Sequence, residues 1–180
     1  MPREKNNDQP RPSFSPDELS IILRELEALV IQGDQIVSGC AISHDLLALI
    51  GLLAHSGLRP TEKEVYALQH ADVDVVSDQE NPHLVLTIGQ SKTIPRTVVT
   101  LAEAKSFYEK KIKSRAYESE AEFVFFPNFP DRKRAADVAR RQFKWLLRRL
   151  ELQQDKWGNG RVLYSLRHYY VQQRLASEVN

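Results

Sequence analysis

Apolar residues recur at helical spacing between Ser15 and Ile31, so this stretch is expected to form the first helix. The segment "SPDE" at its start supplies an N-cap serine, a proline at the first helical position and a glutamate for a capping box. Gly33 is expected to end the helix. A second helix, predicted from about Ser43 to Ser56, reads "DLLALIGLLAH" and is apolar on most sides, which indicates a place at the centre of the core.

One later part of the chain has a strong β pattern, because "HLVLTI" and "RTVVTL" flank the polar turn "GQSKTIP" and predict a hairpin. Before it, Thr61 is expected to cap a short helix, with Glu64 completing a second capping box. After it we expect a polar helix ("AEAKSFYEKKIKSRA"), then a short strand that runs into a proline-broken loop ("EFVFFPNFP"). A long helix over 134–152 and a final helix from Tyr164 or Ser165 should follow. The sequence therefore predicts a mostly helical α+β fold, with a flexible tail over residues 1–13 and one ordered unit over 14–180.

The overall charge conceals a basic segment. The 180 residues carry a net charge of +1, which by itself does not favour a nucleic-acid partner. Between residues 132 and 149, however, eight basic residues accompany one acidic residue, Asp137; the basic ones are Arg132, Lys133, Arg134, Arg140, Arg141, Lys144, Arg148 and Arg149. They predict either a surface that follows a DNA backbone or the solvated face of an amphipathic helix.

Composition argues against several other classes of protein. The longest apolar run, residues 46–54, is far shorter than the roughly 20 residues that a membrane helix needs. The first residues have no apolar segment of the kind found in signal peptides, and the single cysteine, Cys40, has no partner for an internal disulfide. The sequence also lacks metal-ligand spacings and phosphate-binding glycine loops. We therefore expect a cytoplasmic protein with no membrane span, no metal and no other cofactor.

Three cationic residues have unusual neighbours in the sequence. Arg59 follows the end of the apolar helix in "SGLRPTE", and Lys92 lies in the predicted hairpin turn. Arg167 lies in the first turn of the last helix, where the helix dipole disfavours a cation. Taken singly, these residues are explained as a helix cap, a solvated lysine and half of an ion pair.

Taken together and in this order, "GLRPTE", "SKTIPRTVVTL" and "YSLRHYY" resemble the tyrosine recombinase (phage integrase) family, from about Phe14 to Ala176. The resemblance implies that family's catalytic-domain fold, double-stranded DNA as partner and possible self-association on DNA. In such enzymes a tyrosine attacks a DNA phosphodiester, two arginines hold the phosphate and a lysine protonates the leaving 5′ oxygen. The resemblance assigns Arg59 and Arg167 to the phosphate and Lys92 to the proton, with Glu62 orienting Arg59. Guanidinium groups suit this role because they remain charged and bind phosphate oxygens through paired N–H groups.

Two departures from the family pattern qualify this assignment. Tyr164 stands where the family has a histidine, and a phenol donates a hydrogen bond but is no base at neutral pH. His168, one turn later on the same face, is a candidate to share its role. The sequence ends before the expected nucleophile, and Tyr169 and Tyr170 are poor substitutes because they share a rigid helix with Arg167. We expect Tyr170 in the core and Tyr169 half exposed.

The sequence leaves three functions open. The first is a partial catalytic domain of a site-specific recombinase for DNA integration and recombination, without its nucleophile-bearing helices, which binds DNA but does not cleave it. In this interpretation the DNA-binding residues are Arg132, Lys133, Arg134, Arg140, Arg141, Lys144 and Arg148. The second is a non-catalytic DNA-binding remnant or regulator, and the third is a soluble interaction domain with no role on DNA.

Overall fold

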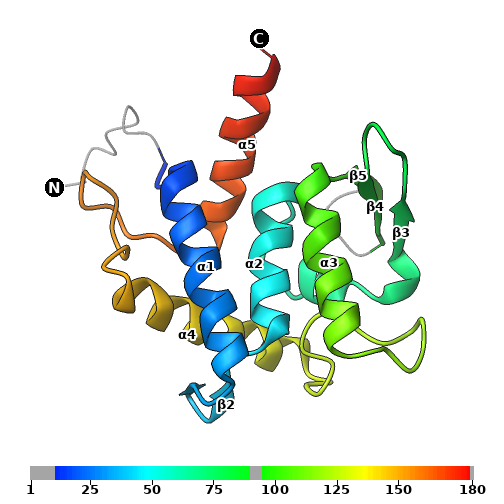
Figure 1. Cartoon of the computed structure of the whole chain (residues 1–180), viewed down its shortest axis with the longest axis horizontal. Coiled ribbons are helices and arrows are strands. Elements are labelled where there is room, and N and C mark those ends of the chain that lie inside the picture. Colours follow the sequence, from blue (N-terminus) through cyan, green and yellow to red (C-terminus); the bar gives the residue numbers. More distant parts are fainter. Residues whose placement is uncertain (1–10, 90–94, 179–180) are drawn as a thin grey trace, which may run out of the picture.

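The structure is a computed structural model that describes residues 11–89 and 95–178. Helices make up most of it, and a three-stranded sheet lies at one side, next to α3 (Figure 1). The elements in chain order are α1 (Pro16–Gln32), β1 (Ile36–Val37), β2 (Cys40–Ala41), α2 (His44–Ser56), the 3-10 helices η1 (Val65–Ala67) and η2 (His70–Asp72), β3 (Val73–Val76), β4 (His83–Ile88), β5 (Arg96–Val99), α3 (Ala102–Ser114), α4 (Arg132–Arg149) and α5 (Tyr164–Glu178). The predicted α+β class, mostly helical with a small antiparallel sheet, is confirmed.

Helix α2 is the centre of the core, as its apolar sequence predicts. Every residue from Leu46 to Ser56 is buried, and the helix packs against α1, α3, α4 and α5. Burial of each leucine or isoleucine side chain contributes about 1.5–3 kcal/mol to folding. Gly57 ends α2 in the left-handed conformation, with φ 65°. Although α2 is apolar, none of the helices in the described ranges is both long and apolar enough to cross a membrane.

The predicted start and end of α1 are confirmed. The Ser15 hydroxyl accepts the Glu18 N–H at 3.2 Å, and the Glu18 carboxylate accepts the Ser15 N–H at 2.8 Å, which completes the capping box. Gly33 then ends the helix with φ 76°. Helix α1 therefore begins at the point that the "SPDE" motif indicates.

The sheet has the antiparallel order β3-β4-β5. The predicted hairpin is β4 and β5, in which Leu86 pairs with Val98 and Ile88 pairs with Arg96. Alternate residues of β4, including Leu86 and Ile88, are buried. Strand β3, "VDVV", was not predicted, because its exposed aspartate and valine give no alternating apolar pattern.

Two predicted elements are absent from the described part of the chain. In place of a helix capped by Thr61, residues 61–64 form a turn that leads into η1. In place of the short strand expected at the start of "EFVFFPNFP", a single β-bridge joins Phe123 to Gln69. Phe125 and Phe126 are both buried, and their carbonyl groups accept hydrogen bonds from Arg132, so this backbone has no strand partner.

Arg161 fastens the segment before α5 to the start of α1. Its Nε donates to the Ser13 carbonyl at 2.8 Å, and its Nη2 donates to the Glu18 carboxylate at 2.8 Å. The guanidinium also lies 4.9 Å from the centroid of the Phe14 ring. One side chain thus joins two segments that lie far apart in the sequence.

Candidate nucleic-acid interface

Arg59 directly follows the end of α2 and is held by the carboxylate of Glu64. The Arg59 backbone N–H donates to Glu64 Oε1 at 2.9 Å, and its Nη1 donates to Oε2 at 3.3 Å. The Glu64 side chain is 2% exposed, whereas that of Arg59 is 32% exposed. Arg59 is therefore fixed in orientation and still reaches the surface.

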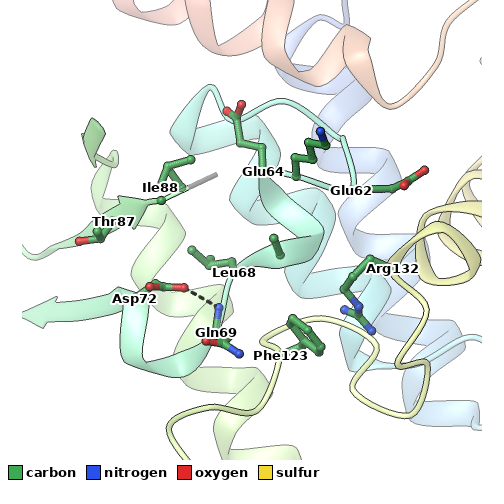
Figure 2. Close-up of a pocket in the computed structure, with 12 residues that line it drawn as sticks. Glu62, Glu64, Leu68, Gln69, Asp72, Thr87, Ile88, Phe123 and Arg132 are labelled. Atoms are coloured by element: carbon green, nitrogen blue, oxygen red, sulfur yellow. Dashed lines mark hydrogen bonds between the residues drawn. The ribbon is translucent and has the colours of Figure 1, made fainter. Parts of the chain in front are cut away.

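The carboxylate expected to orient Arg59 was that of Glu62, and this prediction needs correction. Glu62 is exposed, and the two glutamates point in different directions (Figure 2). The turn over residues 61–64 replaces the regular helix on which the three-residue spacing relied. This turn brings Glu64, rather than Glu62, back to Arg59.

Arg96 reaches the same carboxylate from the sheet. Its Nη2 lies 2.5 Å from Glu64 Oε1. The residue was not predicted as part of the site, although it faces Ile88 across the hairpin and so lies on the core-facing side of β5. An arginine at a core-facing strand position is unusual, and this feature of the sequence could have marked Arg96 as part of the site. Lys92, the predicted general acid, lies outside the described residues.

A pocket of about 750 Å³ opens beside Arg59. One wall is the segment from Arg59 to Glu64, and the opposite wall is α4 with the start of α5. Four of its lining residues are cationic: Arg59, Lys63, Lys133 and Arg140. Arg140 also pairs with Asp137 at 2.7 Å, yet its side chain remains two-thirds exposed. Three acidic residues, Glu62, Glu64 and Asp137, also line the pocket, so its lining carries a small excess of positive charge.

Tyr164 lines this pocket from the first turn of α5. Its ring packs edge-on against His168, with centroids 5.2 Å apart. Burial, together with the positive charges of Arg11 and Arg167, lowers the pKa of His168, so the imidazole is mostly neutral at pH 7. The two aromatic residues that the sequence analysis considered together are thus in contact.

Arg167 is directed toward the end of α2. Its Nη1 donates to the carbonyl oxygen of Gly57, two residues before Arg59. This acceptor offsets the unfavourable position of a cation in the first turn of a helix. The two predicted phosphate-binding arginines, from distant parts of the sequence, therefore lie at the same end of α2.

The basic residues of α4 differ in their surroundings. Six are exposed and form a stripe along the helix: Lys133, Arg134, Arg140, Arg141, Lys144 and Arg148. Arg149, at the end of the helix, pairs with Glu25 of α1 at 2.6 Å. Beyond the pocket at Arg59, the stripe borders a second hollow of about 520 Å³, whose apolar lining includes Phe143, Leu147 and Leu163. This arrangement fits the predicted DNA-facing surface, although it is also that of a solvated helix face.

Arg132 is not part of this stripe, and its predicted role on DNA needs correction. Its guanidinium donates to the carbonyls of Tyr66, at 3.0 Å, and of Phe125 and Phe126, at 2.9 Å each, and also to that of Phe129. It stacks on the Phe123 ring at 3.9 Å, beside a smaller pocket of about 420 Å³ (Figure 2). Burial lowers the pKa of Arg132. The side chain thus holds the loop before α4 together instead of facing solvent.

The tyrosines next to Arg167 occupy the reverse of their predicted positions. Tyr169 is buried, 7% exposed, and meets His55 of α2 edge-on at 6.4 Å. Tyr170 is half-buried and lies over Gly57, and its hydroxyl accepts the Arg174 Nε–H at 3.1 Å. A glycine at the end of α2 leaves room for the Tyr170 ring, and this could not be read from the helix alone.

Comparison with known proteins gives a structural similarity without a sequence match. No family model matches the chain, and no curated protein matches it. The crystal structure of XerA recombinase is similar, with a TM-score of 0.61 and 18% sequence identity over 94% of this chain. The match covers 52% of the XerA chain, so this chain spans about half of that protein. The similarity establishes a shared fold, and it confirms the predicted tyrosine recombinase catalytic-domain-like architecture.

Proposed function

We propose that this chain is the DNA-binding part of a site-specific recombinase of the tyrosine type, in which Arg59 and Arg167 hold one backbone phosphate of duplex DNA. The observation that carries the proposal is that both arginines lie at the C-terminal end of α2: Arg59 follows this end in the chain, and Arg167 donates to the carbonyl of Gly57, two residues before Arg59. The similarity in fold to XerA recombinase supports it.

The chemistry at this end of α2 suits a phosphodiester. The guanidinium groups of Arg59, which lines the pocket, and of Arg167, which reaches Gly57, offer paired N–H donors to the non-bridging oxygens. The Tyr164 hydroxyl donates a further hydrogen bond from the opposite wall. Such donors act most strongly where negative charge accumulates in a pentavalent transition state. In this proposal Lys92 protonates the leaving oxygen, and Arg96 anchors one end of the hairpin that carries it.

The α4 stripe extends the same surface along the DNA. From Lys133 to Arg148 the helix rises about 22 Å, at about 1.5 Å per residue. This length matches roughly six base pairs along the duplex axis. We expect the stripe to contact backbone phosphates, which gives affinity without sequence preference and with a strong dependence on salt.

Cleavage by this mechanism also needs a tyrosine placed in line with the phosphate. The sequence has six tyrosines, and the structure describes them all. Tyr66, Tyr108 and Tyr169 are buried, and Tyr117 stacks on His70. Tyr170 lies on Gly57 with its hydroxyl bound, which leaves Tyr164 as a donor in the pocket. In our proposal Arg59, Arg167 and Tyr164 bind and polarise the phosphodiester, and none of the six tyrosines attacks it.

A second function, a regulator that occupies recombination sites without chemistry, is favoured by Tyr164 at the position of the family's histidine. A nicked suicide duplex separates the binding function from direct attack, because it traps any tyrosine–DNA ester. We expect no covalent adduct of the 180-residue chain on a denaturing gel. An adduct that is lost in Tyr164→Phe would contradict the assignment of Tyr164 as a donor only.

Fluorescence anisotropy with a labelled duplex tests the binding function itself. We expect Kd to rise steeply between about 50 and about 200 mM salt. Arg59→Gln and Arg167→Gln should each weaken binding at least about tenfold, the usual effect of losing a charged hydrogen bond. Arg24→Gln, which changes an exposed arginine of α1, is the matched control and should leave Kd nearly unchanged. No binding at low salt, or equal losses in all three variants, would refute the proposal.

A further inference from the structure

The carboxylate of Glu64 is shared between two guanidinium groups from different parts of the fold. Glu64 Oε1 lies 2.5 Å from Arg96 Nη2, and Oε2 lies 3.3 Å from Arg59 Nη1. The Glu64 side chain is almost fully buried, whereas the two arginine side chains are each about one-third exposed. Burial of a carboxylate costs free energy unless cations pair with it, and the two arginines provide that pairing here.

The sum of charges in this group matters for an incoming anion. Arg59 and Glu64 alone would have no net charge, so a phosphate at Arg59 would also meet the field of the carboxylate. With Arg96 the three side chains carry a net charge of +1. Because Arg96 makes the shorter of the two contacts, it takes the larger part of the interaction with Glu64.

Building on the proposed function, we infer that Arg96 is a positioning residue of the phosphate site. It balances the charge of Glu64, so that Glu64 can fix the orientation of Arg59 without cancelling its charge. Arg59 is thereby both oriented and free to bind an external phosphate. Arg96 acts through Glu64 and does not touch the DNA.

The position of Arg96 in the sheet supports an indirect role. Arg96 is the first residue of β5 and pairs with the buried Ile88 of β4, so its side chain lies on the core-facing side of the sheet. The sheet therefore brings the Arg96 guanidinium to Glu64 Oε1, whereas Arg59 Nη1 approaches Oε2 from the segment after α2.

A charge-rescue experiment on the 180-residue chain tests the inference by anisotropy with a labelled duplex. Arg96→Gln leaves Glu64 to neutralise Arg59, so we expect Kd to rise about tenfold, with a shallower salt dependence. Adding Glu64→Gln restores a net charge of +1, and its amide oxygen can still accept the Arg59 N–H. The double variant should return to within about threefold of the wild-type Kd and regain its salt slope.

Three controls keep the test decisive. Arg96→Lys retains the charge and should bind within about threefold of the wild type, which covers the case in which a glutamine variant unfolds. Arg115→Gln removes an arginine that is paired with Glu122 at 2.7 Å elsewhere, and it should leave Kd unchanged. Circular dichroism checks that each variant is folded.

The outcomes separate the inference from the proposed function. If the wild type does not bind DNA, the proposed function fails and the inference fails with it. If the wild type binds but Arg96→Gln has no effect, the inference alone is refuted. The same holds if the folded double variant remains as weak as Arg96→Gln, because Arg96 would then contact DNA directly or only hold the hairpin.

Discussion

The ring of Tyr170 lies against Gly57, the residue that ends α2. A Cβ atom at position 57 would come within 2.5 Å of Tyr170 Cδ1, and the backbone there has φ 65°. We expect Gly57→Ala to lower the free energy of unfolding by about 2–4 kcal/mol, through left-handed strain and overpacking together. Urea denaturation measures this change.

Gly39→Ala is the matched control for Gly57→Ala. Gly39 also has a positive φ, 77°, but an added Cβ would meet no atom within 4 Å. Its replacement should therefore cost only the backbone strain, about 1–2 kcal/mol. Equal losses in the two variants would mean that the Tyr170 contact contributes nothing.

Two neighbouring basic residues at the start of α4 should affect different properties, Arg132 the stability of the fold and Lys133 the binding of DNA. Arg132→Met removes the donor to four backbone carbonyls and should lower the unfolding free energy by about 2–4 kcal/mol. Lys133→Met alters an exposed residue of the pocket and should change stability by less than about 0.5 kcal/mol while weakening DNA binding. Thermal unfolding and anisotropy on both variants measure the two effects. If the Arg132→Met protein is stable but binds DNA more weakly, Arg132 contacts DNA, as the sequence first indicated.

A buried histidine should make the stability depend on pH. His70 is 3% exposed, its Nδ1 lies 2.8 Å from the Tyr108 hydroxyl, and its ring stacks on Tyr117 at 4.0 Å. Burial and the charge of Lys111 lower the pKa of His70, against the opposing effect of Glu122. The unfolded chain therefore binds a proton below about pH 6.5 that the folded chain resists.

The unfolded state binds more protons in this pH range. The stability that comes from keeping His70 neutral is therefore complete above about pH 6.5, and the free energy of unfolding should decrease as the pH falls toward the lowered pKa. Urea midpoints at about pH 7.5, 6 and 5 measure the slope. His70→Gln, which does not titrate, should reduce the slope. An unaltered slope in His70→Gln would assign the effect to His168, whose pKa is also lowered by burial.

The hydroxyl of Tyr164 should contribute a single hydrogen bond to the phosphate. Tyr164→Phe is expected to raise Kd for duplex DNA about 2- to 10-fold, the range for one such bond. Tyr164→His, which restores a donor, should bind within about threefold of the wild type. If Tyr164→Phe binds as tightly as the wild type, the hydroxyl does not reach the phosphate.

Local signals in the sequence predicted the elements that local contacts determine. The Ser15–Glu18 capping box and the helix ends at Gly33 and Gly57 depend on residues a few positions apart, and they were confirmed. The hairpin of β4 and β5 followed from its alternation. Strand β3 was missed because it becomes a strand by pairing with β4, and its own pattern does not require this.

The errors at the candidate site have a common cause, which is that tertiary contacts decide the direction of a side chain. The family resemblance assigned Glu62 to orient Arg59 or its neighbours, but a turn brings Glu64 to Arg59 instead. Position on a basic helix favoured an exposed Arg132, yet carbonyls from loops far away in sequence draw it inward. Arg96 was missed because its role depends on a carboxylate 32 residues earlier in the chain.

The clamp made by Arg161 has a consequence for how the protein emerges from the ribosome. The start of α1 is synthesised early, but its Ser13 carbonyl and Glu18 carboxylate receive their donor only when residue 161 has been made. Phe14 likewise packs against Phe143 of α4. The environment of the first helix is therefore complete only after the chain has been made through α4 and on to residue 161.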